Sequence, residues 1–152
     1  IMDDYKKTFE YKRNLFDYFD VLKKSSHTYI FYLNKCKVTY NQKGYVSFKF
    51  TSSWYAGGIG ETKDYGLTYR LRDGKKMTVQ DVVYGKRSSV KKKIADTYAK
   101  KVYRIGYKYI MKMKYSDIDF YVKPGKKVCV CFGPYQPMGG HGRSVIVLKG
   151  KI

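Results

Sequence analysis

Histidine residues are the first place to look for a catalytic base in this sequence. The only two imidazoles are His27 and His141, and neither stands in a motif with a serine or cysteine nucleophile. A nucleophilic triad needs a base beside the nucleophile and a third group that orients this base. The sequence therefore argues against nucleophilic catalysis of this type.

Two carboxylates offer a second chemical possibility. Asp117 and Asp119 are two positions apart and would project from the same face of an extended segment. Glycoside cleavage uses two carboxyl groups about 5 to 9.5 Å apart, but aspartate at the entry of a strand is more often a solvated residue. We predict no catalytic residue, and a pocket that gathered Asp117, Asp119 and His141 would instead indicate an enzyme.

The three cysteines, Cys36, Cys129 and Cys131, do not form a zinc pattern. Tetrahedral zinc needs four ligands at suitable spacing, so we predict neither a metal nor a cofactor. Cys129 and Cys131 alternate with Val130 in an expected strand and therefore share one face. Two interpretations stay open: all three are small buried side chains, or Cys36 forms a disulfide with Cys129 or Cys131.

The glycine run Gly57-Gly58-Ile59-Gly60 could be mistaken for a phosphate-binding loop. It lacks the Lys-Ser or Lys-Thr ending of a P-loop and the spacing of a dinucleotide fingerprint. Glycine permits positive φ and a close backbone approach. We interpret the run first as a bend between two strands and second as the rim of a binding surface.

The net charge of +20 indicates which partners the chain attracts. Such a charge attracts polyanions over about 8 Å in physiological salt, so nucleic acid, anionic lipid and anionic cell-wall polymer all fit. A solvated, lysine-rich surface is the alternative. The stretches 98–104 and 107–115 interleave lysine with aromatic rings, as single-strand binders do, but no zinc-finger, ribonucleoprotein or KH signature accompanies them.

The length of 152 residues and the 43% hydrophobic content predict a folded single domain. No stretch approaches the roughly 20 apolar residues of a membrane span, and no signal peptide opens the sequence. This pattern fits either a cytosolic protein or a mature or truncated ectodomain.

The first segment, 1–24, is predicted to be a helix that packs on the domain formed by residues 25–152. Acidic residues begin this segment, lysines end it, and its apolar residues recur at helical spacing: Phe9, Leu15, Phe16, Phe19 and Leu22.

Strands are expected next. A hairpin turn is predicted at 41–44, followed by a half-buried strand in which Val46, Phe48 and Phe50 alternate with Tyr45, Ser47 and Lys49. A further strand over 67–72 ends at the Asp73-Gly74 turn.

Helices then alternate with a second group of strands. Thr78 and Asp81 predict a capped short helix, and a longer helix follows Ser88 or Ser89 with an apolar stripe of Val90, Ile94, Tyr98, Val102 and Ile105. Strands are expected over 120–122, 128–132 and 144–148. This order predicts an α+β fold, with a mostly antiparallel sheet and helices packed on one face.

Two groups of motifs resemble a known family. The stretches 55–60 and 69–83 resemble a "Y-x-G-G-A-H … Y-D-L-x-T-G-K-x-L-T-L-x-D-L-F" pattern, and 120–142 resembles the "F-Y … P-Y-x-x-A-P-Y-A-x-G" hairpin. Together they are similar to the C-terminal domain shared by lysozyme-sensing bacterial anti-sigma factors and a peptidoglycan N-acetylglucosamine deacetylase. Ile59-Gly60 replaces the usual Ala-His, and Arg70 replaces the aspartate of "Y-D-L".

The resemblance implies a non-catalytic, extracytoplasmic binding or sensing module of the bacterial cell envelope, secreted or tethered to the membrane. Its partner would be an anionic cell-wall polymer or a protein ligand such as lysozyme. The alternatives are a lysozyme-binding anti-sigma factor ectodomain and a nucleic-acid-binding domain, although no specific nucleic acid is expected. The expected ligand-binding residues lie in two glycine-rich loops: Tyr55, Gly57, Gly58, Gly60, Tyr135, Gln136, His141 and Arg143.

Overall fold

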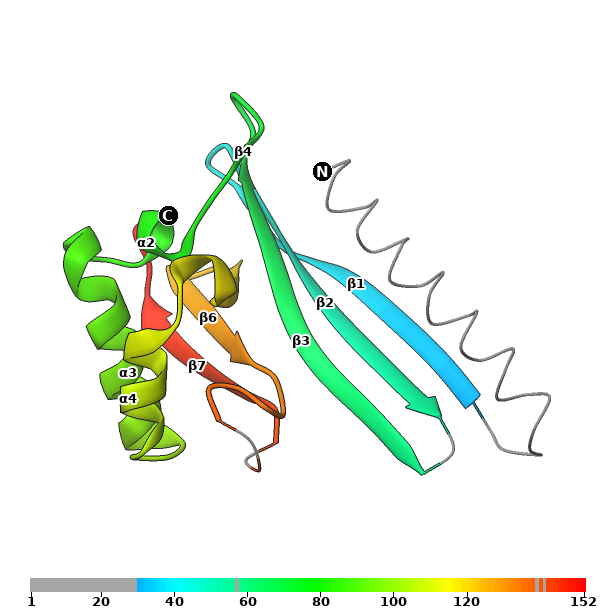
Figure 1. Cartoon of the computed structure of the whole chain (residues 1–152). Helices are drawn as coiled ribbons and strands as arrows, with labels where there is room; N and C mark the ends of the chain where they lie inside the picture. The colour runs from blue at the N-terminus through cyan, green and yellow to red at the C-terminus, as the bar shows by residue number, and fades with distance from the viewer. Residues whose placement is uncertain (1–29, 57, 139, 141) are drawn as a thin grey trace. The chain divides into compact units, whose positions relative to one another are not determined.

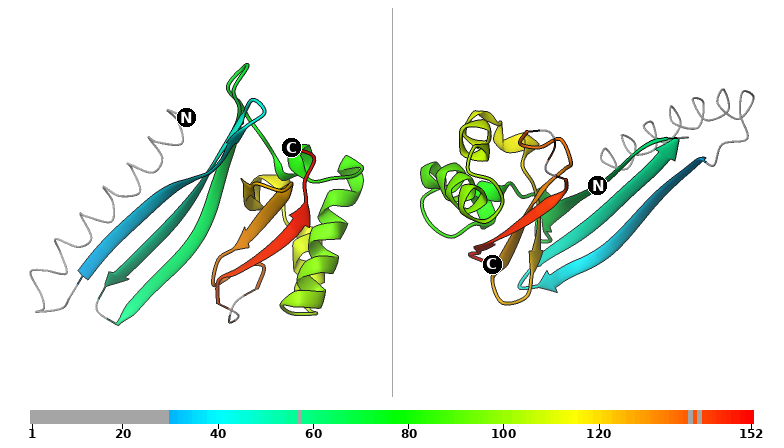
Figure 2. Two further views of the ribbon diagram at one scale, coloured as in Figure 1. Left: turned by 180° about the vertical axis from the view of Figure 1, so that it is seen from behind. Right: turned by 90° about the horizontal axis from the view of Figure 1, so that it is seen from below.

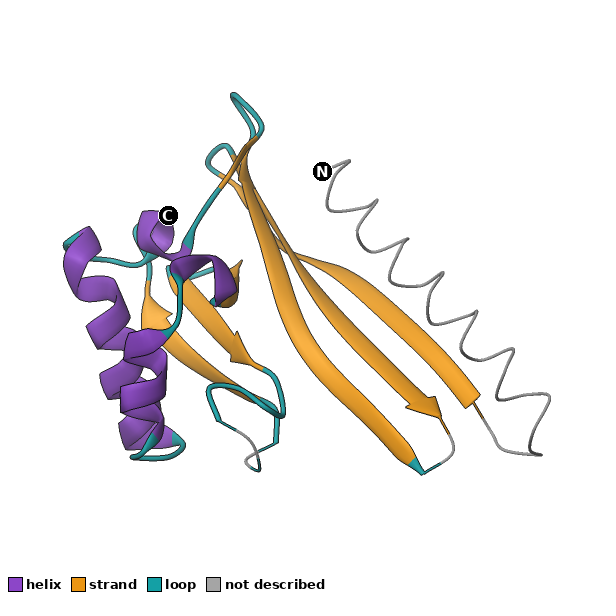
Figure 3. Cartoon of the chain, in the orientation of Figure 1, coloured by secondary structure: helices purple, strands orange, loops and turns teal. Residues whose placement is uncertain are grey.

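The described part of the chain is α+β, which confirms the predicted fold class. The computed structural model describes residues 30–56, 58–138, 140 and 142–152, so the helix expected over 1–24 lies outside the described residues. Two antiparallel sheets, of four and three strands, are joined by short helices (Figures 1 and 3).

The chain divides into two compact units. The described residues of the first unit are 30–33, 53–56 and 58–61, and those of the second are 34–52 and the described residues of 62–152. The first unit holds terminal portions of three long strands. The second unit holds the rest of these strands, all the described helices and the smaller sheet.

The four-stranded sheet has the order β1-β2-β3-β4. Its strands are β1 (Ile30–Gln42), β2 (Tyr45–Ala56), β3 (Ile59–Arg70) and β4 (Lys75–Lys76). Lys43 and Gly44 form the first turn with φ of 52° and 75°, which confirms the predicted hairpin. The short β4 was not predicted; it pairs Lys76 with Tyr69 and Lys75 with Arg70.

The strand β2 is half-buried, as predicted, but its most buried residue is polar. Val46, Phe48 and Phe50 are only half-buried, whereas Ser47 is fully buried, and its hydroxyl lies 2.8 Å from that of Thr68. The same Ser47 hydroxyl accepts a hydrogen bond from the backbone N–H of Val122 at 2.9 Å. The side of β2 that carries Ser47 therefore packs against the smaller sheet. A polar side chain can be buried there because these hydrogen bonds satisfy it.

The smaller sheet has the order β5-β6-β7, and helices cover one of its faces (Figure 1). Its strands are β5 (Asp119–Lys123), β6 (Lys127–Phe132) and β7 (Ser144–Lys149), as predicted to within two residues. The helices are α2 (Val79–Val82), α3 (Val90–Lys101) and α4 (Gly106–Lys112), with 3-10 turns at Arg87–Ser89 and Tyr115–Asp117.

The main core lies between these helices and the smaller sheet. Val90, Ile94 and Tyr98 of α3 are fully buried, and the Tyr98 ring meets Phe132 edge-on at 4.8 Å between centroids. Burying each such side chain stabilises the fold by about 1.5–3 kcal/mol. The predicted stripe is wrong beyond Lys101, where α3 ends, and it leaves Val102 and Ile105 exposed.

The three cysteines are free thiols, so the disulfide interpretation is wrong. Cys129 and Cys131 are buried beside Tyr121, as the other interpretation predicted for them. Cys36, by contrast, is exposed on β1. Burial raises the pKa of the Cys131 thiol, so this group stays protonated and unreactive at neutral pH.

Candidate anion-binding surface

The first predicted loop joins β2 to β3 in the first unit. Tyr55 stacks on Phe31, with ring centroids 6.2 Å apart. Gly58 has a φ of 109°, which favours glycine. A Cβ atom on Gly60 would lie 2.7 Å from the carbonyl oxygen of Trp54, so glycine allows the close return of the chain there. Gly57 lies outside the described residues. Gly58 and Gly60 thus fit the first interpretation, a bend between two strands.

The second predicted loop follows β6 in the second unit. Tyr135 is 70% exposed, and the backbone N–H of Gln136 donates to the carbonyl oxygen of Gly133 at 3.0 Å. Arg143 is half-exposed and reaches Asp64 at 3.7 Å. His141 lies outside the described residues. Since the two loops belong to different units, their joining into one surface stays a prediction.

Two aspartates of the second unit are held by basic side chains. Asp64 accepts hydrogen bonds or ion pairs from Thr51, Lys49 and Arg143; burial alone would raise its pKa, but these partners lower it on balance. Arg70 lowers the pKa of Asp73 to about 2. Both carboxylates are therefore ionised, and paired basic side chains balance their negative charges within the fold. They do little to repel an anionic ligand.

Ionisation of a third carboxylate, Asp119, should lower the stability of the fold in a way that depends on pH. Burial raises the pKa of Asp119 to about 6, although Lys63 and Lys76 oppose this effect. Because the folded state holds this proton more tightly than the unfolded state, stability should fall as pH rises from about 4 to about 6. This loss should amount to about 2–3 kcal/mol.

We expect Asp119→Asn to remove this loss and to raise the free energy of unfolding at pH 7. Urea unfolding from pH 4 to 7 would measure it. Asp96→Asn, an exposed change on α3, should leave the slope of unfolding free energy against pH as it is in the unmodified protein. An unchanged slope in the Asp119→Asn protein would show that the buried carboxylate is not its source.

A basic surface lies elsewhere in the second unit, around the exposed Tyr84. The ring of Tyr84 is 57% exposed, with the Nζ of Lys149 at 5.0 Å and that of Lys93 at 5.8 Å from its centroid. Lys93 Nζ also donates to the carbonyl oxygen of Tyr84 at 2.8 Å. Two ammonium groups therefore lie within cation–π range of one exposed ring.

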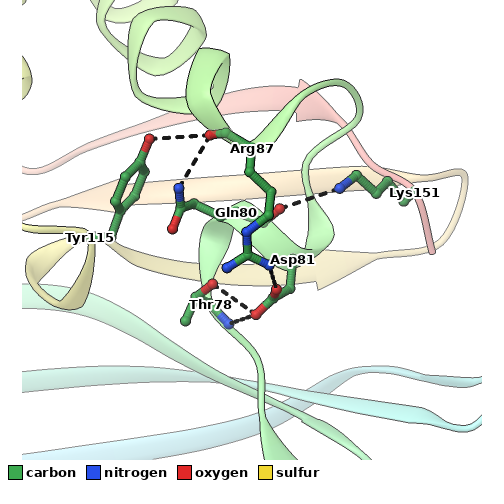
Figure 4. A network of polar contacts seen from close by, with 6 residues as sticks. All are labelled: Thr78, Gln80, Asp81, Arg87, Tyr115 and Lys151. Atoms are coloured by element: carbon green, nitrogen blue, oxygen red, sulfur yellow. Dashed lines mark hydrogen bonds and ion pairs between the residues drawn. The ribbon is translucent and has the colours of Figure 1, made fainter.

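A second group of polar contacts lies around Arg87 (Figure 4). The carbonyl oxygen of Arg87 accepts from Gln80 at 3.2 Å and from Tyr115 at 3.4 Å. Lys151 Nζ donates to the carbonyl oxygen of Gln80 at 3.4 Å, and Lys91 Nζ lies 4.7 Å from the Tyr115 ring centroid. We call the residues of these two groups together the basic platform: Tyr84, Arg87, Lys91, Lys93, Tyr115, Lys149 and Lys151.

The capping box of α2 fixes one side of the basic platform. Asp81 accepts from the backbone N–H of Thr78 at 3.0 Å and from its hydroxyl at 2.8 Å, as predicted, and it also pairs with Arg87 (Figure 4). Burial would raise the pKa of Asp81, but Thr78 and Arg87 lower it on balance. Ionised Asp81 thus anchors Arg87, whereas the lysines of the platform form no ion pair with an acidic side chain among the described residues.

Sequence reasoning missed the basic platform because its members come from distant segments. Tyr84 and Lys149 are 65 positions apart, and they meet where Val83 bridges to Gly150 beside β7. The stretches 98–104 and 107–115 that interleave lysine with tyrosine contribute only one platform residue, Tyr115. Tyr98 of these stretches is buried in the core.

Neither a metal centre nor a membrane span emerges from the described residues. Within the described ranges, no three His, Cys, Asp or Glu residues gather to hold a metal ion. None of the helices in that part of the chain is long and apolar enough to cross a membrane. Of the carboxyl pair, Asp117 is exposed and accepts a hydrogen bond from the Ser116 hydroxyl at 2.8 Å.

Comparisons with known proteins assign no family to the chain. No family model matches it, and no curated protein matches it.

Proposed function

We propose that this chain is a non-catalytic binding or sensing domain of the bacterial cell envelope that binds an anionic wall polymer through the basic platform. The observation that carries the proposal is the exposed Tyr84 ring with the ammonium groups of Lys93 and Lys149 both in contact range, on a protein with a net charge of +20. Ammonium groups that share one exposed ring suit a polymer with repeated phosphates, because each contact releases a counterion.

The distribution of charge supports this proposal. Residues 1–29 contain six basic and five acidic residues, so 26 basic and seven acidic residues follow from Ile30 onwards. Almost the whole excess therefore belongs to residues 30–152, which include the basic platform. The motif resemblance supports an extracytoplasmic location, secreted or tethered at the cell surface.

A protein ligand such as lysozyme fits this surface less well. Lysozymes are commonly basic, and like charges slow encounter and oppose binding. Single-stranded nucleic acid is the stronger competitor, because the exposed rings of Tyr84 and Tyr109 could stack on bases. A polymer of polyol phosphate has charge but no bases, so the two ligands can be told apart.

The test is retention of the protein on purified cell wall with and without teichoic acid, beside single-stranded DNA and a basic lysozyme, each at physiological salt. We expect retention on wall that carries teichoic acid and its loss when the polymer is removed. Retention by DNA alone would contradict an envelope role, and retention by lysozyme alone would indicate a sensor.

The basic platform itself is tested by Lys93→Ala/Lys149→Ala. We expect this double variant to bind the polymer at least about tenfold more weakly, a change of about 1.4 kcal/mol. The matched control is Lys43→Ala/Lys112→Ala, which removes the same charge from exposed positions in the β1–β2 turn and at the end of α4. Equal losses in both variants would show that net charge, and not the platform, binds the polymer.

A further inference from the structure

The strand β7 is an edge strand of the smaller sheet, and we call its side away from β6 the border (Figure 2, red). The backbone N–H of Gly150 donates toward β6, to the carbonyl oxygen of Lys126 at 2.6 Å, while the carbonyl oxygen of Lys149 points outward and accepts from Tyr84. Backbone groups of successive residues alternate in direction along an antiparallel strand. The N–H and C=O groups of Val145 and Val147 therefore point outward, away from β6.

The far end of this border already pairs with a strand-like segment. Val83 forms an antiparallel bridge with Gly150, and the N–H of Lys151 donates to the carbonyl oxygen of Val82 at 2.7 Å. This pairing stops at Lys149. In the part of the chain that the structure describes, we find no backbone hydrogen bond from another element to Val145 or Val147.

The side chains along the border make a regular pattern. Val145 is 39% and Val147 45% exposed, and they lie opposite the buried Cys131 and Cys129 in the register of the sheet. Arg143 and Lys149 flank them at spacings of two, and both are exposed, although the Arg143 guanidinium also lies 3.7 Å from Asp64. Along the border, two apolar side chains, Val145 and Val147, thus lie between two basic ones, Arg143 and Lys149. No charge, proline or glycine interrupts 144–148, whereas natural border strands are usually blunted by such residues.

We propose that this border adds an extended segment of a partner protein as a fourth strand, with two apolar residues opposite Val147 and Val145. An acidic residue on either side of this apolar pair would reach the side chains of Lys149 and Arg143; at the Lys149 end the strand pairing itself stops before Tyr84, which already bonds the Lys149 backbone. Backbone hydrogen bonds to Val145 and Val147 would hold the segment, as in other cases of strand addition. Charge selects this occupant. If a second copy of this chain paired antiparallel with β7, Arg143 of one copy would face Lys149 of the other. Like charges that face each other across a strand pair are destabilising.

The experiment uses the whole chain and the capped peptide Glu-Thr-Val-Thr-Val-Thr-Glu as the probe. Antiparallel pairing would place its two valines opposite Val147 and Val145. Amide hydrogen exchange followed by NMR should show that saturating peptide slows exchange at Val145 and Val147 at least about tenfold. Ile146, which already faces β6, should change little. Unchanged exchange at both valines would overturn the proposal.

Two modified peptides separate strand addition from attraction by charge alone. N-methylation of the two valines blocks the edge that faces β7, and we expect it to weaken binding at least about tenfold. N-methylation of the three threonines blocks the opposite edge and should leave binding within about threefold. Equal binding of the two peptides would overturn the proposal, as would protection that grows with protein concentration when no peptide is present, since this would indicate a second copy. None of these outcomes depends on the binding of a wall polymer.

Discussion

Gly66→Ala is expected to lower the free energy of unfolding by about 3–5 kcal/mol, among the largest effects of any single substitution here. A Cβ atom at Gly66 would lie 2.6 Å from the carbonyl carbon of Phe120 and closer still to its oxygen, and 2.8 Å from Cβ of Tyr121. The obstacle is the backbone of β5, which cannot rotate away as a side chain can. The substitution should therefore force the two sheets of the second unit apart.

Urea unfolding of the variant measures this loss. Gly44→Ala is the matched control: its φ is 75°, but a Cβ atom added there would meet no other atom within 4 Å. It should cost about 1–2 kcal/mol from backbone conformation alone. If Gly66→Ala cost no more than this control, the close approach of β3 to β5 would be wrong.

Ser47→Ala should be the second large loss, about 2–4 kcal/mol. The Ser47 hydroxyl is fully buried between the hydroxyl of Thr68 and the backbone N–H of Val122. Its removal leaves both of these groups without that partner, and each buried unsatisfied group costs about 1–3 kcal/mol. The same unfolding measurement applies.

Ser116→Ala provides the comparison for this variant, because it removes an exposed hydroxyl that bonds to Asp117. It should change stability by less than about 0.5 kcal/mol. A Ser47→Ala protein as stable as Ser116→Ala would contradict the packing of β2 against β5.

Local signals in the sequence sufficed for most elements of the smaller sheet and its helices. Pro124-Gly125 marks the β5–β6 turn, and the Thr78–Asp81 pair marks the start of α2 because both signals act within a few residues. The apolar stripe of α3 was predictable as far as Tyr98, but not its end. Gly106 begins a new helix, α4, and the spacing of Val102 and Ile105 only imitates a continued stripe.

The face of β2 was not predictable from alternation alone. Val46, Phe48 and Phe50 are the more apolar set, yet Ser47 is the most buried residue in that stretch. Its burial depends on partners 21 and 75 positions away, Thr68 and Val122, which a local pattern does not contain. Alternation in the sequence shows which side chains are apolar. It does not show which polar side chain finds hydrogen-bond partners that allow its burial.

The candidate site shows the same limit. The glycine loops were visible because a glycine run is a local feature, and the structure gives the first one the role of a bend. The basic platform depends on a contact between Tyr84 and Lys149 across the end of β7. Composition predicted an anionic partner through the charge of +20, but only the three-dimensional arrangement indicates which lysines would meet it.

The most direct test of the account is the salt dependence of polymer binding by the unmodified protein and the two double-lysine variants. The slope of log affinity against log salt concentration reports how many charges the ligand meets. We predict that Lys93→Ala/Lys149→Ala makes this slope shallower by about 2, since each lost phosphate contact removes about 1. Lys43→Ala/Lys112→Ala should leave the slope unchanged. Equal slopes for all three proteins would contradict binding at the basic platform.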